Sequence, residues 1–189
     1  PFAGEPSLTF CLTSGAHYTL EYTGSKKTIA MNEIGRHLVR LIGNVLKPSG
    51  FRNQGNTWVL KTDECVCAVN IQKSEWSNSF YLNVSVSPAG LIGDRIPPYY
   101  DFDISVRATQ LTGCERLDEA LNFQNGTSSI SDEAALSIEH CLRDHVLPFI
   151  SSLTTVKELR EFLKGSLASR VAVRARLRDY LGSHQEGSP

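Results

Sequence analysis

The sequence predicts an α+β fold, in which an antiparallel β-sheet meander is flanked by an N-terminal helix and C-terminal helices. Three observations predict it. Apolar residues from 31 to 45 recur every three or four positions, which indicates a helix with one buried face. Segments between 57 and 86 alternate apolar and polar residues across short turns, which is typical of an antiparallel meander. Segments that begin with helix-capping residues then follow from Ser131 onward.

The first helix is predicted from a single apolar stripe and ends at a turn. The stripe consists of Met31, Ile34, Leu38, Leu41, Ile42 and Val45. Pro48 and Gly50 follow it, and a proline and a glycine in these positions commonly stop a helix.

Four strands are predicted after this turn, at residues 57–61, 65–71, 80–86 and 102–110. Short loops at 62–64 and 74–79 join the first three strands, whereas a proline-rich loop precedes the fourth. Three further helices are predicted at 131–148, 155–165 and 167–181. Ser131 and the acidic residues after it form a capped helix start, and Thr155 with Glu158 forms a capping box.

The chain is expected to divide into an N-terminal hairpin extension (1–30), an α+β core domain (31–149) and a C-terminal helical extension packed on the core (150–189). Two alternating segments around Ser14 and Gly15 predict the hairpin. Met31 is the only methionine and stands where the first helix begins. Residues 1–30 are therefore interpreted either as a genuine additional hairpin or as an extension upstream of an original start.

Composition and charge favour a cytoplasmic protein. The net charge of −1 gives no overall attraction to nucleic acid or to an anionic membrane, and no apolar run is long enough to span a bilayer. The N-terminus lacks the basic and apolar regions of a signal peptide. The five cysteines are odd in number and lack the spacing of a disulfide framework, so we expect reduced thiols.

No motif predicts a metal site, a cofactor or a catalytic centre. Cys65 and Cys67 face the core by strand alternation, so a structural role is expected for both. Cys141 shares a helix with His140 and His145, but the two histidines lie about 140° apart around an α-helix, so no metal is expected there.

Charged residues near the fourth strand and in the last predicted helix are interpreted as solvent-exposed. Asp101 and Asp103 flank an aromatic residue and are expected to be exposed acids at the entrance of a strand. The last predicted helix carries a basic stripe, which is expected to be a solvated face, with nucleic-acid binding as the alternative. The stripe consists of Arg170, Arg174, Arg176 and Arg178.

One face of the predicted sheet collects an unusual set of polar side chains. Neighbouring residues in a strand point to opposite faces, so Asn70 and Gln72 lie on the same face as Tyr81 and Asn83. Arg107 on the fourth strand points the same way. If the strands are neighbours, an amide, tyrosine and arginine patch forms across the sheet.

Two hypotheses explain this patch. In the first, a helix or loop covers the face, and the amides and Arg107 satisfy backbone carbonyl groups. In the second, the face is a recognition surface, because arginine, tyrosine and tryptophan concentrate binding energy in interfaces. Trp76 and Lys73 at the adjoining turn favour the second hypothesis. The candidate binding residues are Asn70, Gln72, Lys73, Trp76, Tyr81, Asn83 and Arg107.

Short motifs in this region resemble a known family. They are Leu46-Lys-Pro-Ser-Gly-Phe51, Gly55-Asn-Thr-Trp58, Val69-Asn-Ile-Gln-Lys-Ser74, Trp76, Phe80-Tyr-Leu-Asn83 and, later, Arg107. In these motifs, residues 31–149 resemble the domain-of-unknown-function 4304 family. The resemblance implies an α+β bacterial domain with no assigned activity, so it supports the fold and leaves the function open.

The patch and the lack of a catalytic arrangement predict a non-catalytic protein-binding module with a protein partner. An immunity protein that neutralises a toxin is its most concrete version. Neither nucleic acid nor a membrane is expected as a partner, no cofactor is expected, and the oligomeric state is left open. The alternative is a small enzyme or an anionic-ligand-binding protein with a polar cleft lined by Asn70, Tyr81, Asn83 and Arg107. A helix sealing that face would exclude the alternative.

Deleting residues 1–30 should lower the melting temperature while leaving one cooperative unfolding transition. The predicted hairpin has one small apolar face, with Leu8, Phe10 and Leu12, which is too small to be stable unless it packs on the core. Differential scanning calorimetry of the full and shortened chains measures the effect. An unchanged melting temperature would instead indicate a loosely attached extension, with Met31 as the original start.

Overall fold

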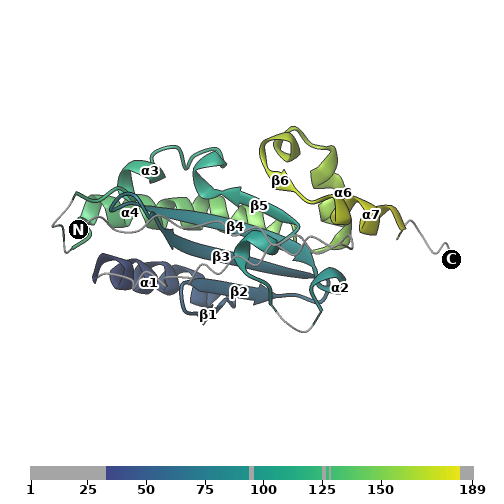
Figure 1. Ribbon diagram of the computed structural model, residues 1–189, viewed down its shortest axis with the longest axis horizontal. Helices are drawn as coiled ribbons and strands as arrows, with labels where there is room; N and C mark the ends of the chain where they lie inside the picture. Colours follow the sequence, from purple (N-terminus) through teal and green to yellow (C-terminus); the bar gives the residue numbers. More distant parts are fainter. Residues whose placement is uncertain (1–32, 94–95, 125–126, 128, 184–189) are drawn as a thin grey trace, which may run out of the picture.

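A six-stranded antiparallel sheet organises the part of the chain that the structure describes (Figure 1). In this computed structural model the described residues are 33–93, 96–124, 127 and 129–183. The strands lie side by side in chain order. They are β1 (Arg52–Gln54), β2 (Thr57–Lys61), β3 (Cys65–Lys73), β4 (Phe80–Pro88), β5 (Ile104–Arg107) and β6 (Ala172–Val173). The predicted α+β fold with an antiparallel sheet is therefore confirmed.

Helices precede the sheet, interrupt it and follow it. The α-helices are α1 (Glu33–Leu46), α2 (Ala89–Ile92), α3 (Leu117–Ala120), α4 (Asp132–Cys141), α5 (Leu147–Ser151), α6 (Val156–Lys164) and α7 (Ala175–Ser183). Short 3-10 turns are η1 (Lys47–Ser49), η2 (Tyr99–Asp101), η3 (Ala108–Gln110) and η5 (Ser166–Arg170), and η4 (Leu142–Val146) is a π-helical turn. None of the helices within the described ranges is long and apolar enough to cross a membrane.

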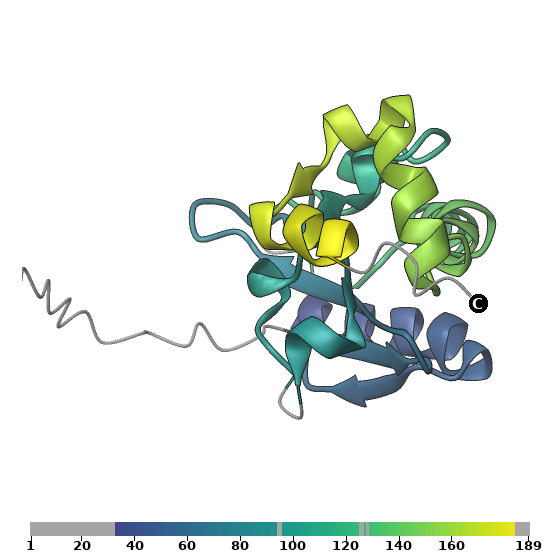
Figure 2. The same ribbon diagram turned by 90° about the vertical axis from the view of Figure 1, so that its right-hand side faces the viewer.

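The main hydrophobic core lies between the inner face of the sheet and the helices α1 and α4, which lie next to each other (Figure 2). As predicted, Cys65 and Cys67 point into this core from β3, together with the apolar residues of β4. The helix stripe that includes Leu38 and Ile42 is also buried there. Because these apolar side chains point inward, the strand residues between them point to the outer face, part of which is polar.

A second apolar cluster covers the other part of the outer face. It consists of Val59, Val66, Ala68 and Phe102, with partly buried residues of the β4–β5 connection packed against it. This connection contains α2 and η2, and both contact β3 and β4. The outer face is therefore half covered by the connection, and its polar residues lie at the border of the covered area.

The C-terminal region differs from the predicted helix at 167–181. Residues 166–170 form a 3-10 turn, β6 pairs with β5 through Val173 opposite Ile104, and only α7 is helical. Valine favours extended backbone on a pleated surface, and here the edge of β5 supplies the pairing partner. The fourth strand is also shorter than predicted, because the chain turns into η3 after Arg107. The predicted hairpin at 1–30 lies outside the described residues.

The helix predicted to end at Pro148 continues to Ser151. A π-helical turn, η4, immediately precedes the helical segment that contains the proline. Proline has no N–H to donate to the carbonyl four residues earlier, and wider turns of this kind help a helix to accommodate such a residue.

A disulfide joins Cys114 to Cys141, whose Cα atoms lie 5.3 Å apart. The prediction of reduced thiols is therefore wrong for this pair, while Cys65 and Cys67 are free. The two bonded cysteines are 27 residues apart and meet because α3 packs against α4, a contact that cysteine spacing alone does not reveal. The cysteine argument for a cytoplasmic location is thereby removed.

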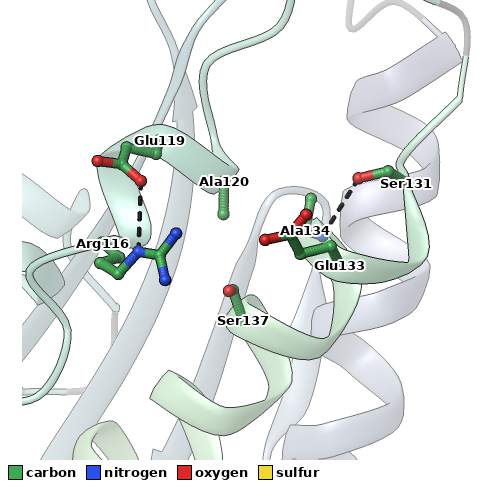
Figure 3. A pocket seen from close by; sticks show the side chains of 7 residues that line it. All are labelled: Arg116, Glu119, Ala120, Ser131, Glu133, Ala134 and Ser137. Carbon is green, nitrogen blue, oxygen red and sulfur yellow. Dashed lines mark hydrogen bonds and ion pairs between the residues drawn. The ribbon is translucent and has the colours of Figure 1, made fainter.

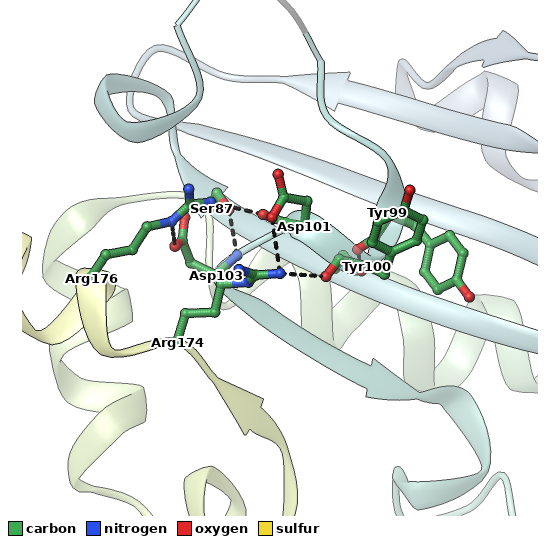
Figure 4. Close-up of polar contacts among 8 residues, drawn as sticks. Ser87, Tyr99, Tyr100, Asp101, Asp103, Arg174 and Arg176 are labelled. Carbon is green, nitrogen blue, oxygen red and sulfur yellow. Dashed lines mark hydrogen bonds and ion pairs between the residues drawn. The ribbon is translucent and has the colours of Figure 1, made fainter. Parts of the chain in front are cut away.

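A buried carboxylate connects the C-terminal segment to the sheet (Figure 4). The side chain of Asp103 is 0% exposed, and its Oδ1 accepts a hydrogen bond of 2.5 Å from Arg176 Nε on α7. Beside it, Arg174 Nη2 lies 2.9 Å from Asp101 Oδ1 and donates to the Tyr100 carbonyl oxygen. An unpaired buried carboxylate is costly, so these arginines hold the C-terminal segment against η2 and β5.

The expected solvent exposure of these charges is therefore only partly correct. Asp103 is fully buried, and Arg174 and Arg176 are engaged in ion pairs, so the predicted basic stripe is divided. All four arginines of the stripe are exposed, as expected, but Arg174 and Arg176 are also paired with aspartates whereas Arg170 and Arg178 form no ion pair within the described residues.

Replacing Arg176 by methionine should destabilise the fold by about 2 kcal/mol, because it leaves the Asp103 carboxylate buried without its cation. Urea-induced unfolding measures the change. The matched control is Arg178→Met on the same helix, which should change the stability by less than about 0.5 kcal/mol. Adding Asp103→Asn to Arg176→Met should recover part of the loss. Equal stability of the Arg176→Met and Arg178→Met variants would contradict a stabilising role for the buried pair.

Candidate functional site

A row of polar residues crosses four neighbouring strands on the outer face. Thr57 lies opposite Asn70, Asn70 opposite Asn83, and Asn83 opposite Arg107. Asn70 Nδ2 donates to Thr57 Oγ1 at 2.8 Å, and Asn83 Nδ2 lies 3.4 Å from Asn70 Oδ1. The two asparagines are buried, so the hydrogen bonds between strands satisfy groups that would otherwise be costly.

The next row extends this network to the η2 turn. Tyr99 Oη donates to Gln72 Oε1 at 2.6 Å, and Asn83 Nδ2 reaches the same oxygen at 3.4 Å. Ser85 Oγ lies 3.3 Å from Ser105 Oγ and also donates to the backbone carbonyl of Tyr99. The η2 turn is thus bonded to the strands at both its backbone and its side chain.

Arg107 and Tyr81 form the exposed margin of the row. The Arg107 guanidinium carbon lies 4.1 Å from the centre of the Tyr81 ring, which is a cation–π contact. Tyr81 is half-buried and Arg107 is exposed. Burial raises the pKa of Tyr99, while the positive charge of Arg107 lowers it, so this charge is felt at the η2 turn.

Trp76 lies apart from this network, in the turn between β3 and β4. Its side chain is 95% exposed, whereas Trp58 is fully buried in the core. The turn itself is held in shape, because Ser74 N–H donates to the Ser79 carbonyl and Ser79 Oγ donates to Asn122 Oδ1. An exposed indole is therefore presented on an ordered turn.

The structure divides the predicted site residues into three groups. Asn70, Gln72 and Asn83 form an internal network of hydrogen bonds, as the covering hypothesis expects. Tyr81, Arg107 and Trp76 keep part or most of their surface exposed. Lys73 has the strand parity of Ile71 and lies opposite Phe80, so it belongs by alternation to the inner face and not to the patch.

An open hollow of about 460 Å³ lies over the outer face next to η2. Of the four residues predicted to line a cleft, Asn83 and Arg107 line it, whereas Asn70 and Tyr81 do not. The face is therefore neither sealed by a helix nor flat. The hollow is lined by Gln72, Asn83, Tyr99, Ser105, Val106, Arg107, Gln110, Arg170 and Ala172.

Sequence reasoning missed the contributions of Tyr99, Gln110 and Arg170 to this hollow. Tyr99 comes from the irregular β4–β5 connection, and Arg170 follows a helix more than 60 residues after β5. The sequence signal for Arg170 is the basic stripe that contains it, and the sequence predicts that stripe as a solvated helix face. Its placement depends on the pairing of β6 with β5.

A second hollow, of about 250 Å³, lies between α3 and the start of α4 (Figure 3). Its lining mixes charges, because Arg116 pairs with Glu119 at 3.4 Å and Glu133 stands nearby. Ser131 caps α4 by accepting a hydrogen bond from the Ala134 N–H. Arg116 and Glu119 are paired with each other and the lining carries charges of both signs, so this hollow suits a ligand of one charge less than the outer hollow does.

The histidines on the long helix lie closer together than an α-helix would place them. The π-helical turn brings the rings of His140 and His145 edge to face at 5.3 Å, and His140 Nδ1 lies 2.6 Å from Asp144 Oδ2. Among the residues that the structure describes, no group of three or more His, Cys, Asp or Glu side chains could hold a metal ion. A ring contact with each other and the close contact of His140 with Asp144 account for these histidines.

Comparison with known protein families finds a match over the core of the chain. A family model described as "Domain of unknown function (DUF4304)" matches residues 42–152, which is more than half of the chain. The match includes strands β1 to β5 and ends before α6, β6 and α7. No curated protein and no solved structure matches the chain.

The Cys65 and Cys67 thiols should resist alkylation in the folded protein. Burial raises the pKa of each to about 12, so the reactive thiolate is scarce near neutral pH. In a Cys11→Ser background, iodoacetamide at about pH 8 should leave both unmodified and should modify both in guanidinium chloride, as mass spectrometry will report. Rapid native-state modification of either residue would contradict a purely structural role.

Proposed function

The chain belongs to the DUF4304 family of domains of unknown function, and from the surface it exposes we propose that it is a non-catalytic protein-binding module. The observation that carries the proposal is the 95% exposure of the Trp76 side chain on an ordered turn. Tryptophan is the residue type most enriched among those that dominate interface energies. A large apolar ring held in water gains most when a partner covers it.

The Arg107–Tyr81 pair adds a second contact of the same kind. Arginine stacked on an aromatic ring is held in place while its N–H donors remain available. Within the described part of the chain, no carboxylate forms an ion pair with Arg107. The partner best suited to this surface presents an apolar pocket for the indole and an acidic group for the guanidinium.

The interior network supports a binding role more than a catalytic one. The side chains of Asn70, Gln72 and Asn83 do not titrate, and they are already bonded to one another and to η2. Groups held in this way supply a rigid platform for the exposed residues. The free thiols, Cys65 and Cys67, lie in the core with raised pKa values, which makes them poor nucleophiles.

The most concrete form of this proposal is an immunity-type protein of a bacterium that binds and neutralises a toxin. Family resemblance and the small α+β fold suggest this form by analogy. In it, the toxin is the protein partner and is encoded next to the gene for this chain. The surface chemistry described for Trp76 and Arg107 then predicts an acidic, partly apolar toxin surface.

Replacing Trp76 by alanine should weaken binding of the neighbouring gene product by at least about 30-fold, because truncation of a central aromatic anchor commonly costs 2 kcal/mol or more. Titration calorimetry with the purified partner measures this. The control is Leu136→Ala on α4, which removes another exposed apolar side chain (68% exposed) and should change the affinity by less than about twofold.

Intrinsic fluorescence provides an independent measurement in the same titration. Covering Trp76 should shift its emission to shorter wavelength and protect it from acrylamide, whereas the buried Trp58 contributes no change. Equal affinities of the wild type, Trp76→Ala and Arg107→Ala for every partner recovered would remove this surface from the proposal.

A further inference from the structure

The hollow over the outer face is assembled from segments that are far apart in the sequence. Gln72, Asn83 and Ser105 contribute from β3, β4 and β5, and Tyr99 contributes from η2. Arg107 and Gln110 come from the end of β5 and the turn after it, and Arg170 and Ala172 come from the C-terminal segment. The ion pairs in Figure 4 hold η2 and this C-terminal segment in place.

The charge of the lining has one sign. Two arginines line the hollow, and none of its lining residues is acidic. Within the described ranges, neither Arg107 nor Arg170 forms an ion pair with a carboxylate. Arg174 and Arg176 nearby are, by contrast, already paired with Asp101 and Asp103.

Two amides that line the hollow, Gln72 and Gln110, use their oxygens as acceptors and keep their amino groups as donors. Gln72 Oε1 is occupied by hydrogen bonds from Tyr99 Oη and Asn83 Nδ2, which leaves the Gln72 amino group to donate. Gln110 Oε1 accepts the backbone N–H of Arg107 at 3.2 Å, which leaves its amino group as well. The lining therefore presents guanidinium and amide donors and lacks a negative group to oppose an anion.

We propose that this hollow is a binding site for a small molecule that carries a phosphate or carboxylate group, held between Arg107 and Arg170. A guanidinium matches either group through two parallel hydrogen bonds. The volume of about 460 Å³ lies within the range of small-molecule sites and exceeds what a bare oxyanion fills, so it suits a small organic anion. The Tyr99 ring supplies a less polar part of its lining.

This site depends on a segment outside the family match. Arg107 lies inside the matched residues 42–152, whereas Arg170 and Ala172 lie beyond them. We therefore propose anion binding for this chain, which has the C-terminal segment, and not for every member of the family. It shares Arg107 with the proposed protein-binding surface, but the two can be tested apart, because Trp76 does not line the hollow and Arg170 is not among the residues proposed to contact a protein partner.

The test titrates the full chain, in separate experiments, with inorganic phosphate, glycerol 3-phosphate and malonate at constant ionic strength. Heteronuclear NMR follows the side-chain amide signals of Gln72 and Gln110. We expect saturable shifts of both signals with at least one probe. Arg107→Gln and Arg170→Gln should each weaken binding at least about tenfold, because hydrogen bonds to charged groups are among the strongest in proteins.

Two variants separate specific recognition from general charge and from misfolding. Arg36→Gln removes one exposed positive charge from α1, on the other side of the sheet, and should leave the affinity unchanged. Arg107→Lys keeps the charge but not the planar fork and should fall between wild type and Arg107→Gln. Melting curves confirm that each variant is folded.

The outcomes decide the proposal directly. Binding of both phosphates, or of malonate, with loss in both glutamine variants supports the site and identifies the preferred oxyanion. No saturable shift with any of the three probes, or equal affinities of Arg36→Gln, Arg107→Gln and Arg170→Gln, would overturn it. Trp76→Ala should bind the same probe with unchanged affinity, so failure of the protein-binding proposal and failure of this one are distinguishable.

Discussion

The outer surface of this protein depends on how one buried carboxylate is compensated. Asp103 directly precedes β5 and has the parity of its outer-face residues, and its side chain is excluded from water. An isolated charge in such a place is unfavourable by several kcal/mol, so the fold requires a cation there, and Arg176 from the far end of the chain supplies it. The same contact region fixes η2, whose Tyr99 completes the amide network. It also holds the segment that carries Arg170 beside the sheet.

The sequence predicts those parts of the fold that follow from local periodicity. Alternation correctly places Cys65 and Cys67 on the inner face and Asn70 and Gln72 on the outer face, because successive side chains in a strand point to opposite faces of the sheet. The C-terminal strand could not be predicted in the same way. Its two residues take extended backbone because the edge of β5 is available to pair with them, and the paired residues are 67 and 69 positions apart in the sequence. Tertiary pairing overrides a weak local preference for helix.

For the candidate site, the sequence predicts which side chains lie side by side, but not which of them stay free to bind another molecule. Register places Asn70, Asn83 and Arg107 side by side, as alternation and a meander imply. Whether an amide is free or occupied depends on groups that arrive from elsewhere, such as the Tyr99 hydroxyl that bonds to Gln72. Internal coverage therefore explains the amides, whereas the recognition hypothesis for Arg107 and Trp76 stays a prediction. Internal hydrogen bonds account for the amides, while Arg107 and Trp76 keep their surface exposed.

Arg107 is the charged residue that both proposals use, and this links them thermodynamically. Its guanidinium rests on Tyr81 on one side and lines the hollow on the other. An acidic group of a protein partner and a small anion would compete for the guanidinium of Arg107. Binding of one would therefore weaken binding of the other by the same factor in both directions, since coupling between two sites is reciprocal. Arg170 allows the two effects to be told apart, because it serves the hollow and lies outside the Trp76 surface.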